Sequence, residues 1–365
     1  MSKVALIGGA GFIGSHLAVR LKNAGHDVLV LDNFAVNNLL AHLDSDRFDV
    51  LSERLGMMKA AGVRMKVLDA RDYHAMSLSL GEFRPDALVH LAAVAHVTHA
   101  NKDPRSTFDH SQRTLENSLD CARNIGIGHL VYLSSSIVYG DFPGGTANEA
   151  TECRPKGLYG VLKLGNEAVV KAYHDLYGLP FTIVRPIALY GPRCVSGRVI
   201  QVWIERAMKG LPLVVKGNGS VTFSHIDDIT AGLGLILDHG AANDVFNLAG
   251  PGAVSLAHVA ELVAAEFGVP VLREPADREM PERGLLEIGK ARETFGYVPR
   301  VAIEAGVKRY VEWYRGRAGV QPHVVEPAAG EGAAVDWGPD VGREVLEPWR
   351  GNRASRDPLH VNGSV

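Results

Sequence analysis

A glycine-rich turn near the start of the chain most constrains what this sequence can fold into. The run from Val4 to Gly14 reads VALIGGAGFIG, so an apolar strand leads directly into Gly8, Gly11 and Gly14. Glycines have no Cβ, which lets the turn close tightly and lets backbone N–H groups approach a phosphate, while the following helix directs its positive end at the same anion. Asp32 ends the next apolar run, where a carboxylate can bind both hydroxyls of a ribose. The pattern predicts a dinucleotide site.

Apolar, strand-like runs alternate with amphipathic, helix-like stretches through the first half of the chain. The expected strands are residues 4–7, 28–31, 63–68, 87–91, 130–133 and 181–184. The expected helices include residues 11–23, 104–124 and 158–177, with a further helix inside 37–61. This alternation predicts an α/β fold, a Rossmann-type doubly wound parallel sheet with helices on both faces.

The pattern changes after Arg185, where the elements become shorter and Pro and Gly more frequent. We expect residues 1–186 to form the NAD-binding domain, with 221–250 returning to it as a helix and a strand. Residues 187–220 and 251–317 are expected to form a smaller C-terminal substrate lobe. Residues 318–365 show no period and are predicted to be an irregular tail.

Charge and cysteine content narrow the class of protein. The net charge is -3 with both signs interspersed, which argues against a nucleic-acid partner or an anionic membrane surface. No apolar run reaches the length of a membrane span, and the N-terminus enters the first strand without a leader segment. The three cysteines, Cys121, Cys153 and Cys194, have no paired spacing. These features predict a soluble cytoplasmic enzyme.

A tyrosine and a lysine four residues apart are the candidate catalytic residues. Tyr159 and Lys163 lie on the predicted helix 158–177, where this spacing places both side chains on one face. A tyrosine titrates near ~10, so a nearby ammonium and an oxidised nicotinamide would be needed to make it a base at neutral pH. The alternative interpretation is two ordinary surface residues on a helix. The strand that ends in Ser134, Ser135 and Ser136 favours the catalytic one, because ligands bind at such strand ends.

The order of the motifs then carries a family resemblance. The segments GGAGFIG at Gly8, HLAA at His90, LSSSIVYG at Leu133, YGVLK at Tyr159 and RPIALYGPR at Arg185 stand in sequence. The chain resembles the extended short-chain dehydrogenase/reductase family of nucleotide-sugar epimerases and dehydratases over roughly residues 3–316. It is most similar to the 4-epimerases of UDP-glucuronate or UDP-galactose. The resemblance implies NAD as cofactor, a nucleotide-sugar substrate and a homodimer.

The resemblance also implies residue roles. Ser135, which stands five residues before the glycine of the VYG motif, takes the place of the catalytic Ser or Thr, beside Tyr159 and Lys163. Asp69 would meet the adenine, and Ala92 and Ala93 would line the centre of the cofactor. The implied cofactor-binding residues are Gly8, Gly11, Phe12, Ile13, Gly14, Asp32, Asn33, Asp69, Ala70, Leu91, Ala92, Ala93, Ser134, Tyr159, Lys163 and Pro186.

Departures from the family pattern bear on the reaction. Family dehydratases carry Asp-Glu after the catalytic Thr, and decarboxylases usually keep the Glu, whereas this chain has Ser136 and Ile137. Both reactions are therefore disfavoured. Ala188 and Ser111 stand where many relatives have Asn. The stretch 219–228 is two residues shorter than its usual counterpart and lacks an Arg that often meets a phosphate there.

Other phosphate and metal candidates are weighed separately. Arg193, Arg198 and Arg283 are candidate substrate contacts, because guanidinium groups suit phosphate oxygens, although each could be an ordinary surface arginine. His90, His96 and His99 lack the usual ligand spacing, so no metal site is expected. Asp227 and Asp228 begin a predicted helix, where a structural capping role is favoured.

The resulting hypothesis is an NAD-dependent sugar epimerase that oxidises a carbinol transiently and returns the hydride to the other face. Two alternatives stay open. One is a true NAD-dependent dehydrogenase or reductase on the same fold, and the other is a non-catalytic NAD-binding regulator. The Ser135, Tyr159 and Lys163 set argues against the regulator, which would need only the glycine turn and Asp32.

Overall fold

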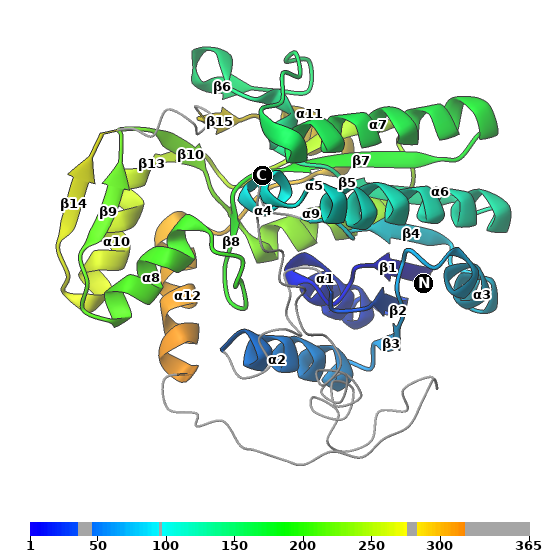
Figure 1. Cartoon of the computed structure of the whole chain (residues 1–365), viewed down its shortest axis with the longest axis horizontal. Helices are drawn as coiled ribbons and strands as arrows, with labels where there is room; N and C mark the ends of the chain where they lie inside the picture. Colours follow the sequence, from blue (N-terminus) through cyan, green and yellow to red (C-terminus); the bar gives the residue numbers. More distant parts are fainter. Residues whose placement is uncertain (36–45, 95–96, 276–282, 318–365) are drawn as a thin grey trace, which may run out of the picture.

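A seven-stranded parallel sheet forms the centre of the molecule (Figure 1). The computed structural model describes residues 1–35, 46–94, 97–275 and 283–317, so the predicted tail lies outside the described residues. The sheet order is β12-β7-β5-β4-β1-β2-β3. These strands are β1 (Lys3–Ile7), β2 (Asp27–Asp32), β3 (Arg64–Val67), β4 (Ala87–His90), β5 (His129–Leu133), β7 (Phe181–Pro186) and β12 (Asp244–Leu248).

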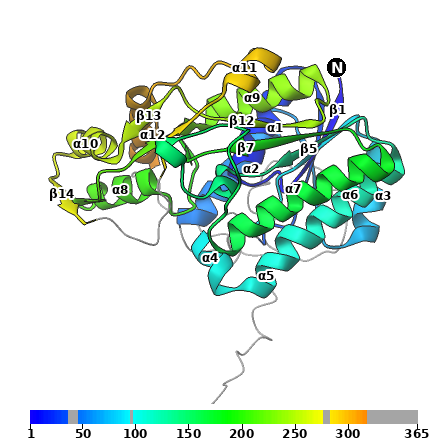
Figure 2. The same cartoon turned by 90° about the horizontal axis from the view of Figure 1, so that it is seen from above.

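Helices cover both faces of this sheet, which confirms the predicted doubly wound fold (Figure 2). One face packs against α1 (Phe12–Asn23), α2 (Asp46–Ala60), α9 (Ile226–His239) and α11 (Gly289–Phe295). The other packs against α3 (Tyr73–Phe83), α6 (Thr114–Ile125) and α7 (Gly157–Tyr177).

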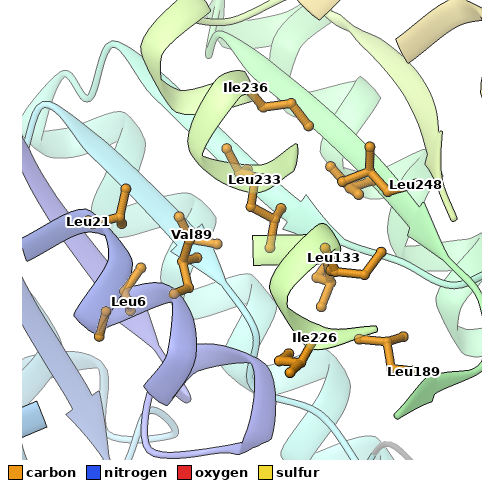
Figure 3. Packing of buried hydrophobic residues seen from close by; sticks show 14 of the residues in the cluster. Leu6, Leu21, Val89, Leu133, Leu189, Ile226, Leu233, Ile236 and Leu248 are labelled. Carbon is orange, nitrogen blue, oxygen red and sulfur yellow. The ribbon is translucent and has the colours of Figure 1, made fainter. Parts of the chain in front are cut away.

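Strand residues alternate between the two layers because successive side chains of a strand point to opposite faces. Leu6 belongs to the first core and Ile7 to the second. Figure 3 shows Val89 from the sheet beside Leu21 of α1 and Leu233 of α9. Strands buried on both faces explain why these runs are apolar throughout rather than alternating in the sequence.

The predicted helix 104–124 is interrupted in the structure. It consists of α5 (Pro104–Phe108), a π-helical turn (Asp109–Arg113) and α6. A short helix, α4 (Val97–Lys102), precedes it. The wider turn is a finding that residue spacing did not predict, and such turns recur at functional sites. Here it buries Ser111, whose hydroxyl accepts a hydrogen bond from the N–H of Val94 at 3.2 Å.

A smaller lobe lies beside the carboxyl ends of the strands, at the left of Figure 1. Its own apolar core contains Trp203, Val259 and Tyr310. The elements of this side are β8 (Leu189–Tyr190), α8 (Val199–Met208), β9 (Leu213–Lys216), β10 (Ser220–Thr222), β11 (Ser224–His225), β13 (Ala253–Ser255), α10 (Leu256–Phe267), β14 (Val271–Glu274) and α12 (Ile303–Arg317).

The structure draws the lobe boundary differently from the prediction at several segments. Ile187 and Leu189 were expected in the lobe but pack in the core of the main sheet, and β10, expected in the main domain, pairs with β13 of the lobe. Residues 286–297 were assigned to the lobe, yet Leu286, Phe295 and Tyr297 pack in the core of the main sheet. This segment includes α11 and follows the short strand β15 (Leu285–Leu286), which pairs with β6 (Thr146–Ala147). Strand β12 lies beside β7 at the edge of the main sheet, as the sequence pattern suggested for residues 245–248.

Candidate active site

The glycine turn between β1 and α1 has a shape that only glycine permits. Gly8 has a φ of 79°, and a Cβ on it would lie 2.7 Å from the nitrogen of Ala92. A Cβ on Gly14 would lie 2.5 Å from the Cα of Gly9. The backbone therefore leaves an open cradle at the N-terminus of α1, where free N–H groups and the helix dipole attract an anion. These residues fit a dinucleotide phosphate.

Asp32 stands at the end of β2 and is fixed by the same turn. One carboxylate oxygen accepts a hydrogen bond from the N–H of Ala10 at 2.9 Å, and the other accepts from Phe34 at 2.8 Å. Burial raises the pKa of Asp32, and these backbone donors oppose that shift. The acid is thus held in the position expected for a ribose contact.

One cavity joins the predicted cofactor residues. Its lining includes Gly8, Gly11, Phe12, Ile13, Gly14, Asp32, Asn33, Asp69, Ala70, Leu91, Ala92 and Ala93. Asp69 lies at this wall with its carboxylate bound by the Arg71 guanidinium, 2.6 Å from Nη2 to Oδ2. Ser134, Tyr159, Lys163 and Pro186 do not line this cavity; they stand at the ends of β5 and β7 or on α7.

The predicted catalytic residues come from β5 and α7. Ser135 follows the end of β5 and precedes a 3₁₀ turn over Ser136–Tyr139. Lys163 is buried, and its Nζ donates to the carbonyl of Leu133 at 2.6 Å. Burial lowers the pKa of Lys163 to about 7, although Glu167 opposes the shift. The lysine is therefore anchored to the strand that carries the serine.

The charge that tunes Tyr159 differs from the expectation. The sequence predicts this role for Lys163 together with an oxidised nicotinamide. In the structure, Nζ of Lys163 lies 6.0 Å from the centre of the Tyr159 ring and donates to the carbonyl of Leu133. Burial raises the pKa of Tyr159, and the opposing effects come from Arg198, the Ser135 hydroxyl and Arg283. The side chains that favour a phenolate here are thus two arginines and a serine, and long-range folding rather than helical spacing brings both arginines there.

A buried polar network connects the end of β5 to the elements that pack around it. The hydroxyl of Ser134 donates to Glu167 at 2.5 Å, and Arg185 donates to both oxygens of Glu167, at 2.9 and 2.6 Å. Arg185 also donates to the hydroxyl of Tyr139 at 2.9 Å, which in turn donates to Asn247 at 2.8 Å. The network links β5, α7, β7 and β12, so it holds the neighbours of Ser135 and Lys163 in one geometry.

The three candidate arginines have different surroundings. Arg283 is half-buried and donates to the hydroxyl of Ser136 at 3.0 Å, and Arg198 lines the cofactor cavity and donates to Ser196 at 3.1 Å. The Arg193 guanidinium lies 2.7 Å from the Glu53 carboxylate, away from the cavity lining. The structure therefore brings Arg198 and Arg283 toward Tyr159 and does not bring Arg193 there.

His90 and Asp228, two of the remaining positions singled out in the sequence, make contacts that stabilise the fold. His90 is buried with its Nδ1 2.9 Å from the Ser118 hydroxyl, and burial lowers its pKa to about 3. Asp228, in the first turn of α9, accepts hydrogen bonds from the N–H groups of Arg300 and Val301. His96 lies outside the described residues. Within the described ranges, no group of three or more His, Cys, Asp or Glu side chains is placed to hold a metal ion. No helix in the part of the chain that the structure describes is long and apolar enough to cross a membrane.

Sequence reasoning missed Arg54. This residue of α2 lines the cofactor cavity and is 3% exposed. A signal existed, because Arg54 falls at helical spacing within the buried apolar stripe of Val50, Leu51, Leu55 and Met58. An arginine in such a stripe needs a polar partner inside the fold, because charged side chains are almost never fully buried unless they are paired.

Comparisons with known proteins agree with this geometry. The model of the NAD dependent epimerase/dehydratase family matches residues 4–249. A probable UDP-glucuronate 4-epimerase of Rhizobium meliloti is 27% identical, covering 85% of this chain and 96% of that protein. A dTDP-glucose 4,6-dehydratase of an Actinoplanes species is also 27% identical, covering 86% and 98%. The crystal structure of a Thermus thermophilus UDP-glucose 4-epimerase in complex with NAD superposes with a TM-score of 0.73 at 28% identity, covering 86% and 99%.

Proposed function

Because the chain belongs to the NAD dependent epimerase/dehydratase family, we propose that it is an epimerase of a nucleotide-activated sugar. The family membership confirms the resemblance carried by the motifs, and NAD is its cofactor. Bound NAD supplies an acceptor that takes a hydride from the sugar and gives it back. The residues that would hold NAD are the glycines of the turn, Asp32 and the other residues that line the cavity.

The observation that carries the proposal is the pair of side chains after Ser135. Ser136 and Ile137 stand where dehydratases of the family have an acid and a base, and neither can donate or remove a proton as a carboxyl group would. Both are buried in the 3₁₀ turn, and Ser136 accepts a hydrogen bond from Arg283. A keto intermediate formed here has no adjacent carboxyl group to divert it into elimination, so hydride return is the simplest exit.

The chain's own residues can perform the proton transfers. Tyr159 accepts the hydroxyl proton of the sugar as a phenolate, and Ser135 donates a hydrogen bond to the oxygen that becomes the ketone. The positive charges of Arg198 and Arg283 favour the phenolate. Lys163, fixed on the carbonyl of Leu133, holds the end of β5 against α7. Epimerisation then requires the ketone to present its other face before the proton and the hydride return.

The test uses a sugar nucleotide deuterated at the reacting carbon, given to the purified full chain with only trace NAD. We expect an epimer that keeps the deuterium, with no accumulation of NADH, because the hydride never leaves the enzyme. UDP-glucuronate and UDP-glucose are the first substrates to try, since they are those of similar proteins. Product formed in proportion to NAD consumed would identify a dehydrogenase instead and overturn the proposal. Release of water or carbon dioxide with the product, the deuterium being retained in it, would identify a lyase.

A further inference from the structure

Arg54 is a buried cation in the wall of the cofactor cavity, and one of its donors has no partner among the described residues. Its side chain comes from the middle of α2, and the residue is 3% exposed. Nη2 donates to the backbone carbonyl of Arg193 at 2.5 Å, whereas Nε has no hydrogen-bond partner among the described residues. Leaving a guanidinium donor unpaired inside a protein is costly, so the site is incomplete without a ligand.

The residues around Arg54 indicate that this ligand is an anion. The guanidinium carbon lies 6.0 Å from the ring centre of Phe12, the first residue of α1. Gly11, Gly14 and Arg198 line the same cavity. The positive end of α1 and two arginines thus face one space. Asp32 is the nearby counter-charge, but both of its oxygens already accept backbone N–H groups. Asp69 also lines this cavity, but its carboxylate is paired with Arg71, so the side-chain donors left for a ligand are cationic and suit an anion.

We propose that Arg54 is a binding residue for the diphosphate of the dinucleotide, acting opposite the glycine turn. The turn supplies backbone N–H groups on one side, and the Arg54 guanidinium supplies a charged donor from α2 on the other. A phosphate on the ribose 2′ position is the other possible source of this anion chemistry. Asp32 disfavours it, because its carboxylate stands at the ribose position and would repel that group.

This assignment adds a link between the cofactor and the lobe. Arg54 holds the carbonyl of Arg193 while its neighbour Glu53 pairs with the Arg193 guanidinium at 2.7 Å. Arg193 belongs to the loop after β8, which also carries Arg198. An occupied diphosphate site therefore fixes α2 against the loop that faces Tyr159. The inference concerns cofactor binding alone and holds whichever reaction the enzyme catalyses.

The experiment measures binding rather than turnover. Full-length protein, freed of NAD, is titrated calorimetrically with adenosine, ADP, NAD and NADP for the wild type, Arg54→Met and Arg54→Lys. A charge-assisted hydrogen bond to a phosphate predicts that Arg54→Met weakens ADP and NAD by about 10- to 150-fold. Adenosine, which has no phosphate, should change by less than about 3-fold on the same reasoning. Arg54→Lys should fall between wild type and Arg54→Met, because it keeps the charge but loses the planar fork.

Lys59→Met is the matched control, because it removes one positive charge from the same helix at a position outside the cavity lining. It should bind all four ligands within about 3-fold of wild type, as expected for a charge that makes no hydrogen bond to them. Adenosine binding also reports whether Arg54→Met still folds around the site. An equal loss for adenosine and ADP would overturn the proposal in favour of a role through Asp32. A loss of affinity for NADP alone would mean that Arg54 binds a 2′-phosphate. Unchanged affinity for ADP would mean that Arg54 serves only to bind the carbonyl of Arg193.

Discussion

The main sheet and the smaller lobe bury polar groups in different ways. Within the described residues, the buried Asp, Glu, Lys and Arg side chains are Arg54, Lys163, Glu167, Arg185 and Asp228, all on elements that pack on the main sheet. The lobe core contains Trp203, Val259 and Tyr310 and includes no fully buried Asp, Glu, Lys or Arg among the described residues; Tyr310, for example, donates to the Cys194 carbonyl at 2.5 Å.

The difference has a physical reason. Buried charges are costly unless each is paired in good geometry, so they are retained where fixed positions matter. The main sheet must hold Ser135, Tyr159, Lys163 and the cofactor cradle in one arrangement. The lobe core carries none of these predicted site residues, and an apolar core tolerates hydrophobic substitutions that conserve its volume. We therefore expect variants in the two regions to differ in both kind and size of effect.

The largest effect should come from the main-sheet site itself. Tyr159→Phe removes the proton-accepting oxygen and keeps the ring, so turnover should fall by about 10²- to 10⁴-fold, the usual range for general acid-base catalysis. NAD affinity should stay near that of the wild type, because phenylalanine keeps the ring and the residues that line the cofactor cavity are unchanged. Steady-state kinetics and NAD titration measure both. Turnover within tenfold of wild type would mean that another group is the base.

The next effect tests the network below the site. Glu167→Gln leaves Arg185 buried beside a neutral amide, and breaking such a pair typically costs about 3–5 kcal/mol of unfolding free energy. Urea unfolding of the wild type and the variant measures the loss. Combining it with Arg185→Met should recover much of the stability, because neither charge is then left unpaired. A single variant as stable as the wild type would contradict the comparison between the two regions.

The third effect is a pH dependence. The pKa of Lys163 is about 7 in the folded chain against an ordinary value of 10.5, so the unfolded chain binds more protons between these values. The unfolding free energy of the wild type should therefore rise from about pH 7.5 to 9.5, by at most ~1.4 kcal/mol per pH unit from this group. Lys163→Met should lack this rise. Parallel pH profiles for the two proteins would show that Lys163 does not titrate in this window.

The smallest effect should come from the lobe. Glu205 on α8 accepts hydrogen bonds from Gln201 and from the Tyr314 hydroxyl, both at 2.8 Å, and it is only half-buried. Glu205→Gln keeps the shape and much of the bonding, so it should cost about 1 kcal/mol of unfolding free energy. The same denaturation assay, run beside Glu167→Gln, gives the contrast directly. An equal cost at both positions would remove the distinction drawn between the regions.

Local sequence patterns determined much of this protein. The strand before Gly8 and the acid at Asp32 predicted the cofactor turn, because their relation depends on a few residues of β1, α1 and β2. The amphipathic stretch 158–177 predicted the helix α7, and the four-residue spacing of Tyr159 and Lys163 predicted their common face. The alternation of apolar runs predicted the doubly wound sheet, because the period of a pattern reports which faces are buried.

The tertiary structure decided which residues from distant parts of the sequence contact those local features. Arg283 reaches Ser136 across 147 residues, and Arg54 reaches the carbonyl of Arg193 across 139. No spacing in the sequence encodes such contacts, because they depend on how the lobe closes against the sheet and on where α2 packs. The cations that favour the Tyr159 phenolate, the partner of Arg193 and the burial of Arg54 were therefore fixed by packing between distant segments.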